Sequence, residues 1–488
     1  MSSAVGPKPV WLRQPASILA WPFVTLCSAT VLGVMLGRGD GKVVVLPFVV
    51  LLLLFLASVP VAGYVAVLWS VGTVVDMIAL PDVSASSVSF EPAEILLLIV
   101  LGSLMFLPRD LRSGLRSLAR RRESVVLMIF LAAVLAGVAT GISHGASATD
   151  AVFGMRTMLF YAAFWPAAVA LSKARSLAFK LVAAGVVAVV ILQLLQVMVG
   201  PSPRLFMIAP QDLGSVYEPE AGGFLRVRPP GLPTVYVVAA FALACALWGP
   251  ARYRLRAWAM TAVTLAGLTV SLNRNMLLGL ALGIAVAALV ARHKHRFVAV
   301  VAGVAIAVAG VAVYAQNSSI GSNAVVARAA SITNYSELKT QTLSDRYYEN
   351  RIALRQIRSH PIAGLGWGPD YGAVVLTSDA GFLVTTPRSS MHEQYLWIWM
   401  RAGIIGLLLI IAVFATGIWN GARWFRARDR NDDAWLGAGI VASMVGIAAS
   451  SNVTQLLVSP DAIVPFVGVL ALAAGLRSQL ASVSPAAG

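Results

Sequence analysis

Three arginines lie at the predicted ends of apolar segments, where a cation near hydrocarbon needs a partner. Arg274 stands in Ser271-Leu-Asn-Arg274 between two apolar runs, and Arg228 precedes two prolines and Gly231 before another. Arg156 lies inside a third run, near its start. An arginine in that setting costs about 2.5–3.5 kcal/mol on insertion scales. If the three guanidiniums converge, they can bind a diphosphate through forked hydrogen bonds; the alternative is that each reaches out to a lipid phosphate.

A histidine begins the apolar segment that follows the longest polar stretch of the chain. Taken as a helix, Met391–Gly406 places His392, Leu396, Trp399 and Gly403 on one face, and Gly403 and Gly406 allow close contact with a neighbouring helix. His392 can serve as a base or orienting group for an acceptor hydroxyl. The alternative is a structural histidine at a membrane boundary.

Several other chemistries are excluded by the motifs. No DxD or HExxH occurs and the five histidines are scattered, so neither a metal site nor another cofactor is expected. Gly364-Leu-Gly-Trp-Gly368 follows a helix and Pro361 and lacks the lysine of a phosphate loop, which favours a turn. Cys27 and Cys245 both lie in apolar stretches and indicate no disulfide framework.

The composition is that of an integral membrane protein. Of 488 residues, 58% are hydrophobic and 12% charged, against about 25% charged in a soluble domain, and the mean hydropathy is +0.81. We expect an all-α polytopic fold with about 12–14 membrane-spanning helices. The apolar windows are residues 17–36, 43–59, 61–79, 93–107, 124–142, 151–171, 181–199, 232–249, 257–272, 276–291, 297–315, 402–419, 435–456 and 463–480.

The net charge of +16 is explained by orientation, because most of the 37 Lys and Arg residues fall in short loops on one expected side. That side is the cytoplasm, and nucleic acid is not an expected partner. Two longer segments lie outside, and the larger contains a helix from Asp345 to Ser359. The predicted organisation is N-terminal spans in 1–200, a first outer loop in 200–231, central spans with Arg274 in 232–315, a large extracytoplasmic loop in 316–391, C-terminal spans in 392–480 and a disordered tail in 481–488.

Four motifs in this order resemble the O-antigen ligase and polymerase superfamily of bacterial membrane glycosyltransferases. The family pattern is His, then Asn, Ser or Gln, nine residues, Gly, two residues, and Gly, Thr or Tyr. His392, Gly403 and Gly406 match its spacing, and Glu393 departs at the second position. The other motifs are Ser271 to Arg274, Arg228 to Gly231, and the loop segment from Asp345-Arg346 to the turn that contains His360, Pro361, Gly364 and Gly366.

The resemblance implies a fold of the GT-C type and a metal-independent, inverting transfer at the extracytoplasmic face of the bacterial inner membrane. The donor would be a glycan on undecaprenyl diphosphate, and the acceptor a hydroxyl of a glycan, lipid or protein. Arg228 and Arg274 would bind the diphosphate, with Arg346 a further candidate, and His392 would serve the acceptor. Arg156 is added from its cost in lipid alone.

Other functions stay open at this point. A polymerase of the same superfamily differs from a ligase only in its acceptor. A transporter or lipid-linked glycan flippase would place ionisable residues near the middle of the bilayer and show related halves, neither of which the sequence shows. A non-catalytic scaffold is favoured only by Glu393.

Overall fold

A computed structural model describes residues 83–291 and 341–483 with short gaps, together with Tyr64 and Leu68. The gaps are residues 86–87, 91, 201–204, 207–216, 220–224, 230, 272, 370–372, 378–382, 388–390 and 428–432. The predicted spans 17–36, 43–59 and 297–315, and all of 61–79 except Tyr64 and Leu68, lie outside the described residues. The predicted tail, 481–488, begins with helix that continues to Val483, and its last five residues also lie outside.

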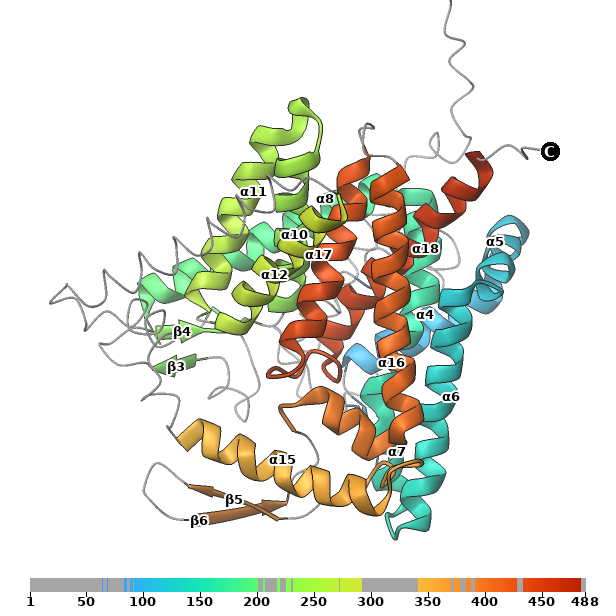
Figure 1. Cartoon of the computed structure of the whole chain (residues 1–488), viewed down its shortest axis with the longest axis vertical. Coiled ribbons are helices and arrows are strands. Elements are labelled where there is room, and N and C mark those ends of the chain that lie inside the picture. Colours follow the sequence, from blue (N-terminus) through green and yellow to red (C-terminus); the bar gives the residue numbers. More distant parts are fainter. Residues whose placement is uncertain are drawn as a thin grey trace, which may run out of the picture.

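Helices make up most of the described chain (Figure 1). They are α4 (Pro92–Ser103), α5 (Arg109–Ala119), α6 (Arg122–Ser143), α7 (Ala148–Met155), α8 (Phe164–Val199), α10 (Leu232–Trp248), α11 (Ala251–Val270), α12 (Arg274–Val290), α15 (Gln341–Ser359), α16 (Gln394–Ala427), α17 (Ala434–Ser450) and α18 (Pro460–Val483), with 3-10 turns η3 (Leu104–Phe106) and η4 (Arg156–Ala163).

The helices confirm an all-α polytopic membrane protein. Within the described residues, four helical stretches are long and apolar enough to cross a membrane: Arg122–Ser143, Ala148–Val199, Gln394–Ala427 and Pro460–Arg477. Shorter apolar helices occupy Ala93–Phe106, Leu232–Trp248, Arg274–Val290 and Ala434–Ser450. Each corresponds to a window of high hydropathy in the sequence, because a helix satisfies its own backbone hydrogen bonds and needs only apolar side chains to lie in lipid.

One pair of predicted spans differs from the prediction. The windows 151–171 and 181–199 were expected as separate helices, and the structure joins them into the continuous stretch Ala148–Val199. Its backbone leaves helical angles inside α8 at Ala174, where φ is −130° and ψ is 34°. The surrounding Lys, Arg, Ala and Leu residues all favour helix, so the chain bends there without a loop.

Helix α17 lies at the centre of the bundle, between α10, α12 and α16 (Figure 1). Its close contact with α12 depends on small residues, as is usual between helices in a membrane. A Cβ atom added at Gly283 would overlap the backbone of Ala442, and one at Gly279 would meet the backbone carbonyl of Gly446 at 2.8 Å. The two helices are therefore held in a closely defined register.

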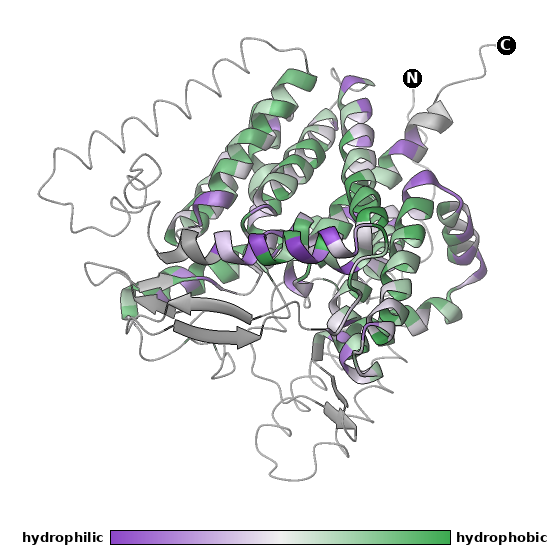
Figure 2. Cartoon of the chain, turned by 60° about the horizontal axis from the view of Figure 1, so that its bottom comes forward, coloured by the Kyte–Doolittle hydropathy of each residue, from purple (hydrophilic) through white to green (hydrophobic). Residues whose placement is uncertain are grey.

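Helix α15 lies across one end of this bundle, next to a hairpin (Figure 1). It carries both hydrophilic and hydrophobic residues along its length, unlike the bundle helices (Figure 2). Glu349, Ala353 and Ile357 form its buried side. The hairpin pairs β5 (Ala373–Thr377) with β6 (Leu383–Pro387) in antiparallel register, Val375 opposite Thr385. Similar short hairpins join β1 (Val83–Ala85) to β2 (Val88–Phe90) and β3 (Tyr217–Pro219) to β4 (Leu225–Val227).

Candidate active site

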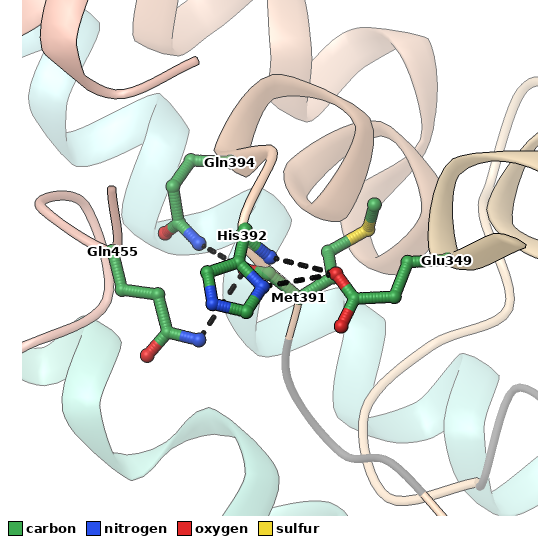
Figure 3. Close-up of polar contacts among 5 residues, drawn as sticks. All are labelled: Glu349, Met391, His392, Gln394 and Gln455. Atoms are coloured by element: carbon green, nitrogen blue, oxygen red, sulfur yellow. Dashed lines mark hydrogen bonds and ion pairs between the residues drawn. The ribbon is translucent and has the colours of Figure 1, made fainter. Parts of the chain in front are cut away.

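A buried carboxylate on α15 holds His392. The Nδ1 atom of His392 lies 3.1 Å from Oε2 of Glu349, and the backbone N–H of His392 donates to the same oxygen over 3.4 Å (Figure 3). An ionised carboxylate only accepts hydrogen bonds, so with Glu349 ionised the Nδ1 atom of His392 is the donor in this contact. The Glu349 side chain is 1% exposed and that of His392 is 39% exposed. The histidine is therefore fixed on one side and open on the other.

The residue before His392 is fixed by two glutamines (Figure 3). The backbone carbonyl of Met391 accepts from the side-chain amide of Gln394 over 2.7 Å and from that of Gln455 over 3.5 Å. The Gln394 N–H donates to the carbonyl of Ser451 over 3.1 Å. Met391 and Gln394 are both fully buried. These contacts determine the backbone position from which the His392 ring projects.

The predicted helix through His392 is wrong in one respect. Helix α16 begins at Gln394, and Gly403 interrupts it with φ of 68°, so His392 and Gly403 do not share a helical face with Leu396 and Trp399. The reason at the start is a cap: the Glu393 carboxylate accepts the Leu396 N–H over 2.7 Å. An N-cap residue has a non-helical backbone, which leaves His392 outside the helix.

Glu393 therefore caps the start of α16. Asn and Ser, which the family pattern has there, are also N-cap residues. Burial raises the pKa of the Glu393 carboxyl, against the opposing effect of its hydrogen bonds to Leu396 and Tyr395. The departure from the pattern therefore keeps the cap.

The connection between α17 and α18, residues 451–459, joins the elements that carry the predicted site residues. Besides the Gln455 contact with Met391, Thr454 Oγ1 accepts from the side-chain amide of Asn275 over 3.5 Å. Ser450, at the end of α17, donates to the carbonyl of Asn275 over 2.9 Å. Asn275 follows Arg274 at the start of α12, where Asn273 caps the helix by accepting the Met276 N–H over 3.4 Å.

The turn that carries Arg228 meets the same region. The Gly231 N–H donates to the carboxylate of Asp461, at the start of α18, over 3.3 Å. Val227, one residue before Arg228, is held by the buried amide of Gln193, which donates to its carbonyl over 2.8 Å and to that of Gly267 over 3.1 Å. Arg228 itself is half-buried. The structure thus brings the segments of Arg228, Arg274 and His392 around one connection.

Arg346 lies on α15, three residues before Glu349, which is about one helical turn. It is half-buried. Burial lowers the pKa of its guanidinium, and the charge of Glu349 opposes that shift. Arg346 and the histidine pair are therefore linked through one carboxylate.

Arg156 has a different environment. Its Nε atom lies 3.1 Å from the Glu94 carboxylate, and its guanidinium stacks 4.9 Å above the ring of Phe153. Glu94 is buried in α4. These contacts join η4 to α4.

The glycine turn packs inside the protein from Gly364 to Trp367, whereas residues 361–363 before it are exposed. Its backbone N–H groups at Leu365, Gly366 and Trp367 donate to the carbonyls of Met400 (2.6 Å), Arg401 (3.2 Å) and Gly137 (3.0 Å). Gly364 and Gly366 have φ of 76° and 82°, and a Cβ atom on Gly366 would overlap the backbone of Gly141. Its N–H groups thus bind protein carbonyls, which fits the prediction of a turn and not of a phosphate loop.

Two functional-site neighbours were missed in the sequence. Glu349 shares the apolar side of its helix with Ala353 and Ile357, and a carboxylate on such a side is the signal that could have found it. Arg401 is 2% exposed, donates to the carbonyls of Gly366 (3.0 Å) and Pro369 (2.6 Å) and lies 4.3 Å above the Trp397 ring. The cost argument that selected Arg274 applies equally to Arg401.

The described part of the chain contains no group of three or more His, Cys, Asp or Glu residues placed to hold a metal ion. The polar groups of the site are instead a histidine–carboxylate pair and several arginines. The arrangement can accept a proton at the histidine and attract an anion at the guanidiniums.

Fold and site together define a multi-pass membrane protein with a polar site at one end of an apolar helical bundle. Residues 259–411 match the family model described as O-antigen ligase. The match supports the resemblance of this part of the chain to the O-antigen ligase superfamily. It contains Arg274, Glu349, the glycine turn and His392, whereas Arg156 and Arg228 precede it. A comparison with curated proteins finds no match. The family indicates a membrane glycosyltransferase of the ligase or polymerase type, with glycan and lipid-linked substrates.

Proposed function

We propose that the protein transfers a glycan from an undecaprenyl-diphosphate-linked donor to an acceptor hydroxyl at the extracytoplasmic face of the bacterial inner membrane. The observation that carries this proposal is the contact of His392 with the buried Glu349 carboxylate. A ligase would use a lipid, protein or different polymer as acceptor, and a polymerase the growing glycan itself. The chemistry at His392 is the same in both.

His392 acts as the base in this proposal. With its Nδ1 proton donated to Glu349, its Nε2 atom has the free lone pair that can accept the proton of the acceptor hydroxyl. Glu349 holds the ring in that tautomer and stabilises the positive charge that forms on it, as the carboxylate does in a Ser-His-Asp triad. The partial exposure of the ring leaves room for an acceptor.

Arg274 and Arg228 hold the diphosphate, and Arg346 adds positive charge from α15. Guanidiniums bind phosphate oxygens through paired hydrogen bonds, and Arg274 begins α12, whose N-terminal dipole also favours an anion. As the acceptor oxygen bonds to the sugar C1, the C1–O bond to the diphosphate breaks and its electron pair leaves with the diphosphate. One displacement inverts the anomeric centre, and the arginines supply the charge that a metal would otherwise provide.

Arg156 has no part in this proposal. An arginine near hydrocarbon needs a partner, and Glu94 provides one through the ion pair that joins two segments of the protein.

The test is transfer by the full-length protein in liposomes that contain a labelled undecaprenyl-diphosphate oligosaccharide and a candidate acceptor. His392→Ala and Glu349→Gln are each expected to lower kcat by about 10²- to 10⁴-fold, because the base is lost or loses its orientation. Arg274→Ala should lower kcat as well as raise the KM for the donor, because Arg274 binds the diphosphate and stabilises the charge that develops on it. Arg109→Ala, in α5, is the matched control and should keep full activity.

The thermal unfolding midpoint of each variant shows whether it remains folded. Full transfer by both His392→Ala and Glu349→Gln would overturn the mechanism. Movement of the labelled lipid across the bilayer without any new glycosidic bond would support a flippase instead.

A further inference from the structure

An apolar groove of about 620 Å³ lies between α8, α10, α11, α17 and α18. It begins at Thr234 and Val464, three residues beyond the Gly231–Asp461 contact, and extends along α10 away from the candidate active site. Helix α10 contributes Thr234, Val237, Val238, Phe241, Ala242 and Cys245 to its wall. This i, i+3, i+4, i+7, i+8, i+11 spacing is one face of a helix, so the groove follows α10 for about 16 Å. This length along α10 is comparable to half the thickness of the hydrocarbon core of a bilayer, about 15 Å.

The walls determine what can fill the groove. Most of the lining side chains on α10 and α18 are aliphatic or aromatic, as in Val464, Val469 and Leu472. A buried water needs two to four polar partners, which such a surface does not offer. A hydrocarbon chain has the right shape and polarity.

One end of the groove is positively charged. Arg175, Lys180 and Arg256 lie there, and Asp433 is the only carboxylate among the described lining residues. Asp433 lies 3.6 Å from Arg175, so the lining retains a net positive charge. This end is opposite the Gly231–Asp461 contact that marks the candidate active site at the start of α10.

A second hollow, of about 310 Å³, meets the groove at Leu171, Arg175 and Leu472. It adds Arg121 and Lys173 to the basic residues, and Arg121 is held in place by donating to the carbonyl of Ala474 over 2.8 Å. An apolar channel that leads into a basic hollow has the chemistry of an acyl chain joined to a phosphate head group.

We propose that this site binds an anionic glycerophospholipid of the cytoplasmic leaflet. One acyl chain lies along α10, and the phosphate lies among Arg175, Lys180 and Arg256, with the rest of the head group toward Arg121 and Lys173. The lipid then bridges α8, α10, α11 and α18, whose other ends position Gln193 and the connection to α18. The site is separate from the proposed glycan transfer and does not depend on it.

The experiment is native mass spectrometry of the full-length protein in detergent with equal amounts of phosphatidylglycerol and phosphatidylcholine of identical chains. The protein should retain phosphatidylglycerol preferentially. A Lys180→Ala/Arg256→Ala variant should bind it roughly 10- to 30-fold more weakly, since each cation near a lipid phosphate contributes on the order of 1 kcal/mol. The matched control is Arg116→Ala/Arg120→Ala, which removes two exposed charges from outside both hollows.

A second variant tests the apolar part separately. Ala242→Trp fills the groove beside α10 and should abolish retention of both lipids, with Ala242→Leu as a milder form if the first fails to fold. Equal retention of the two lipids, or equal loss in the test and control double variants, would overturn the proposal. Displacement of phosphatidylglycerol by undecaprenyl phosphate at equal concentration would also overturn it and assign the groove to a polyprenyl lipid.

Discussion

Glu393 stands where the superfamily pattern has Asn, Ser or Gln, and its contacts show what that position does. Its carboxylate accepts the Leu396 N–H and ends the irregular segment that carries His392. The cap requires a side-chain oxygen that accepts this hydrogen bond, and it does not require a negative charge. Because burial raises the pKa of this carboxyl, the charge opposes folding at neutral pH.

Glu393→Gln is therefore expected to stabilise the protein near pH 7. A raised pKa in the folded state means that the carboxyl contributes favourably below its ordinary value of 4.5 and that this contribution is lost as the pH rises through the raised value. The thermal midpoint of Glu393→Gln should exceed that of the wild type at pH 7, and the difference should shrink toward pH 4. Glu393→Ala, which loses the cap, should be about 0.5–2 kcal/mol less stable than Glu393→Gln. A lower midpoint for Glu393→Gln at every pH would contradict this account.

At the scale of elements, the break in α16 and the glycine turn form one unit. Gly403 has φ of 68°, and Ile404 beyond it donates its N–H to the carbonyl of Pro361 over 3.1 Å. The carbonyls of Met400 and Arg401, before the break, accept the N–H groups of Leu365 and Gly366 in the turn. The indole N–H of Trp399 also donates to the Pro361 carbonyl, over 3.0 Å. The turn thus takes up backbone groups that the interrupted helix would otherwise leave without partners.

Gly403→Ala should destabilise the protein by more than about 2 kcal/mol, because alanine is strained at positive φ and its Cβ would overlap the carbonyl of Ile362. The matched control is Gly114→Ala in α5, where nothing lies within 4 Å of an added Cβ. That change should be neutral or stabilise by up to about 1 kcal/mol. Thermal unfolding in detergent measures both, and equal midpoints would show that the break does not require glycine.

At the scale of the whole molecule, basic residues and the candidate site lie at different ends of the helices. Arg252, Arg254 and Arg256 begin α11, beyond the end of α10, whereas the turn with Arg228 precedes α10. From the positive-inside rule we predict that the site faces the outer side of the membrane. The same division separates the proposed glycan site from the proposed phospholipid groove.

Cysteine labelling in whole cells measures this orientation. In a background of Cys27→Ser and Cys245→Ser, Asn452→Cys places an exposed thiol in the connection before α18, and Ser117→Cys places one on α5. A membrane-impermeant maleimide should label the first in intact cells and the second only after permeabilisation. The reverse result would place the site in the cytoplasm and refute the proposed face of action.

The sequence by itself determined the membrane class, the positions of most apolar helices within the described residues, the glycine turn and the motifs of the O-antigen ligase superfamily. The membrane class depends on the composition of the whole chain. The helices, the turn and the motifs depend on periodicity and spacing within one segment, so they can be predicted without knowing how segments pack together. Cost in lipid, which can be judged for each residue alone, also selected Arg228 and Arg274. His392 was selected by its place at the start of an apolar segment and by its spacing to Gly403 and Gly406.

Only the tertiary structure decided which groups meet. Glu349 lies 43 residues from His392, and Gln455 reaches Met391 from 64 residues away. Arg156, chosen by the same cost, proves to be paired with Glu94. Whether a buried polar group faces a partner depends on how separate helices pack, and packing is a property of side-chain shape across the whole bundle that no single segment encodes.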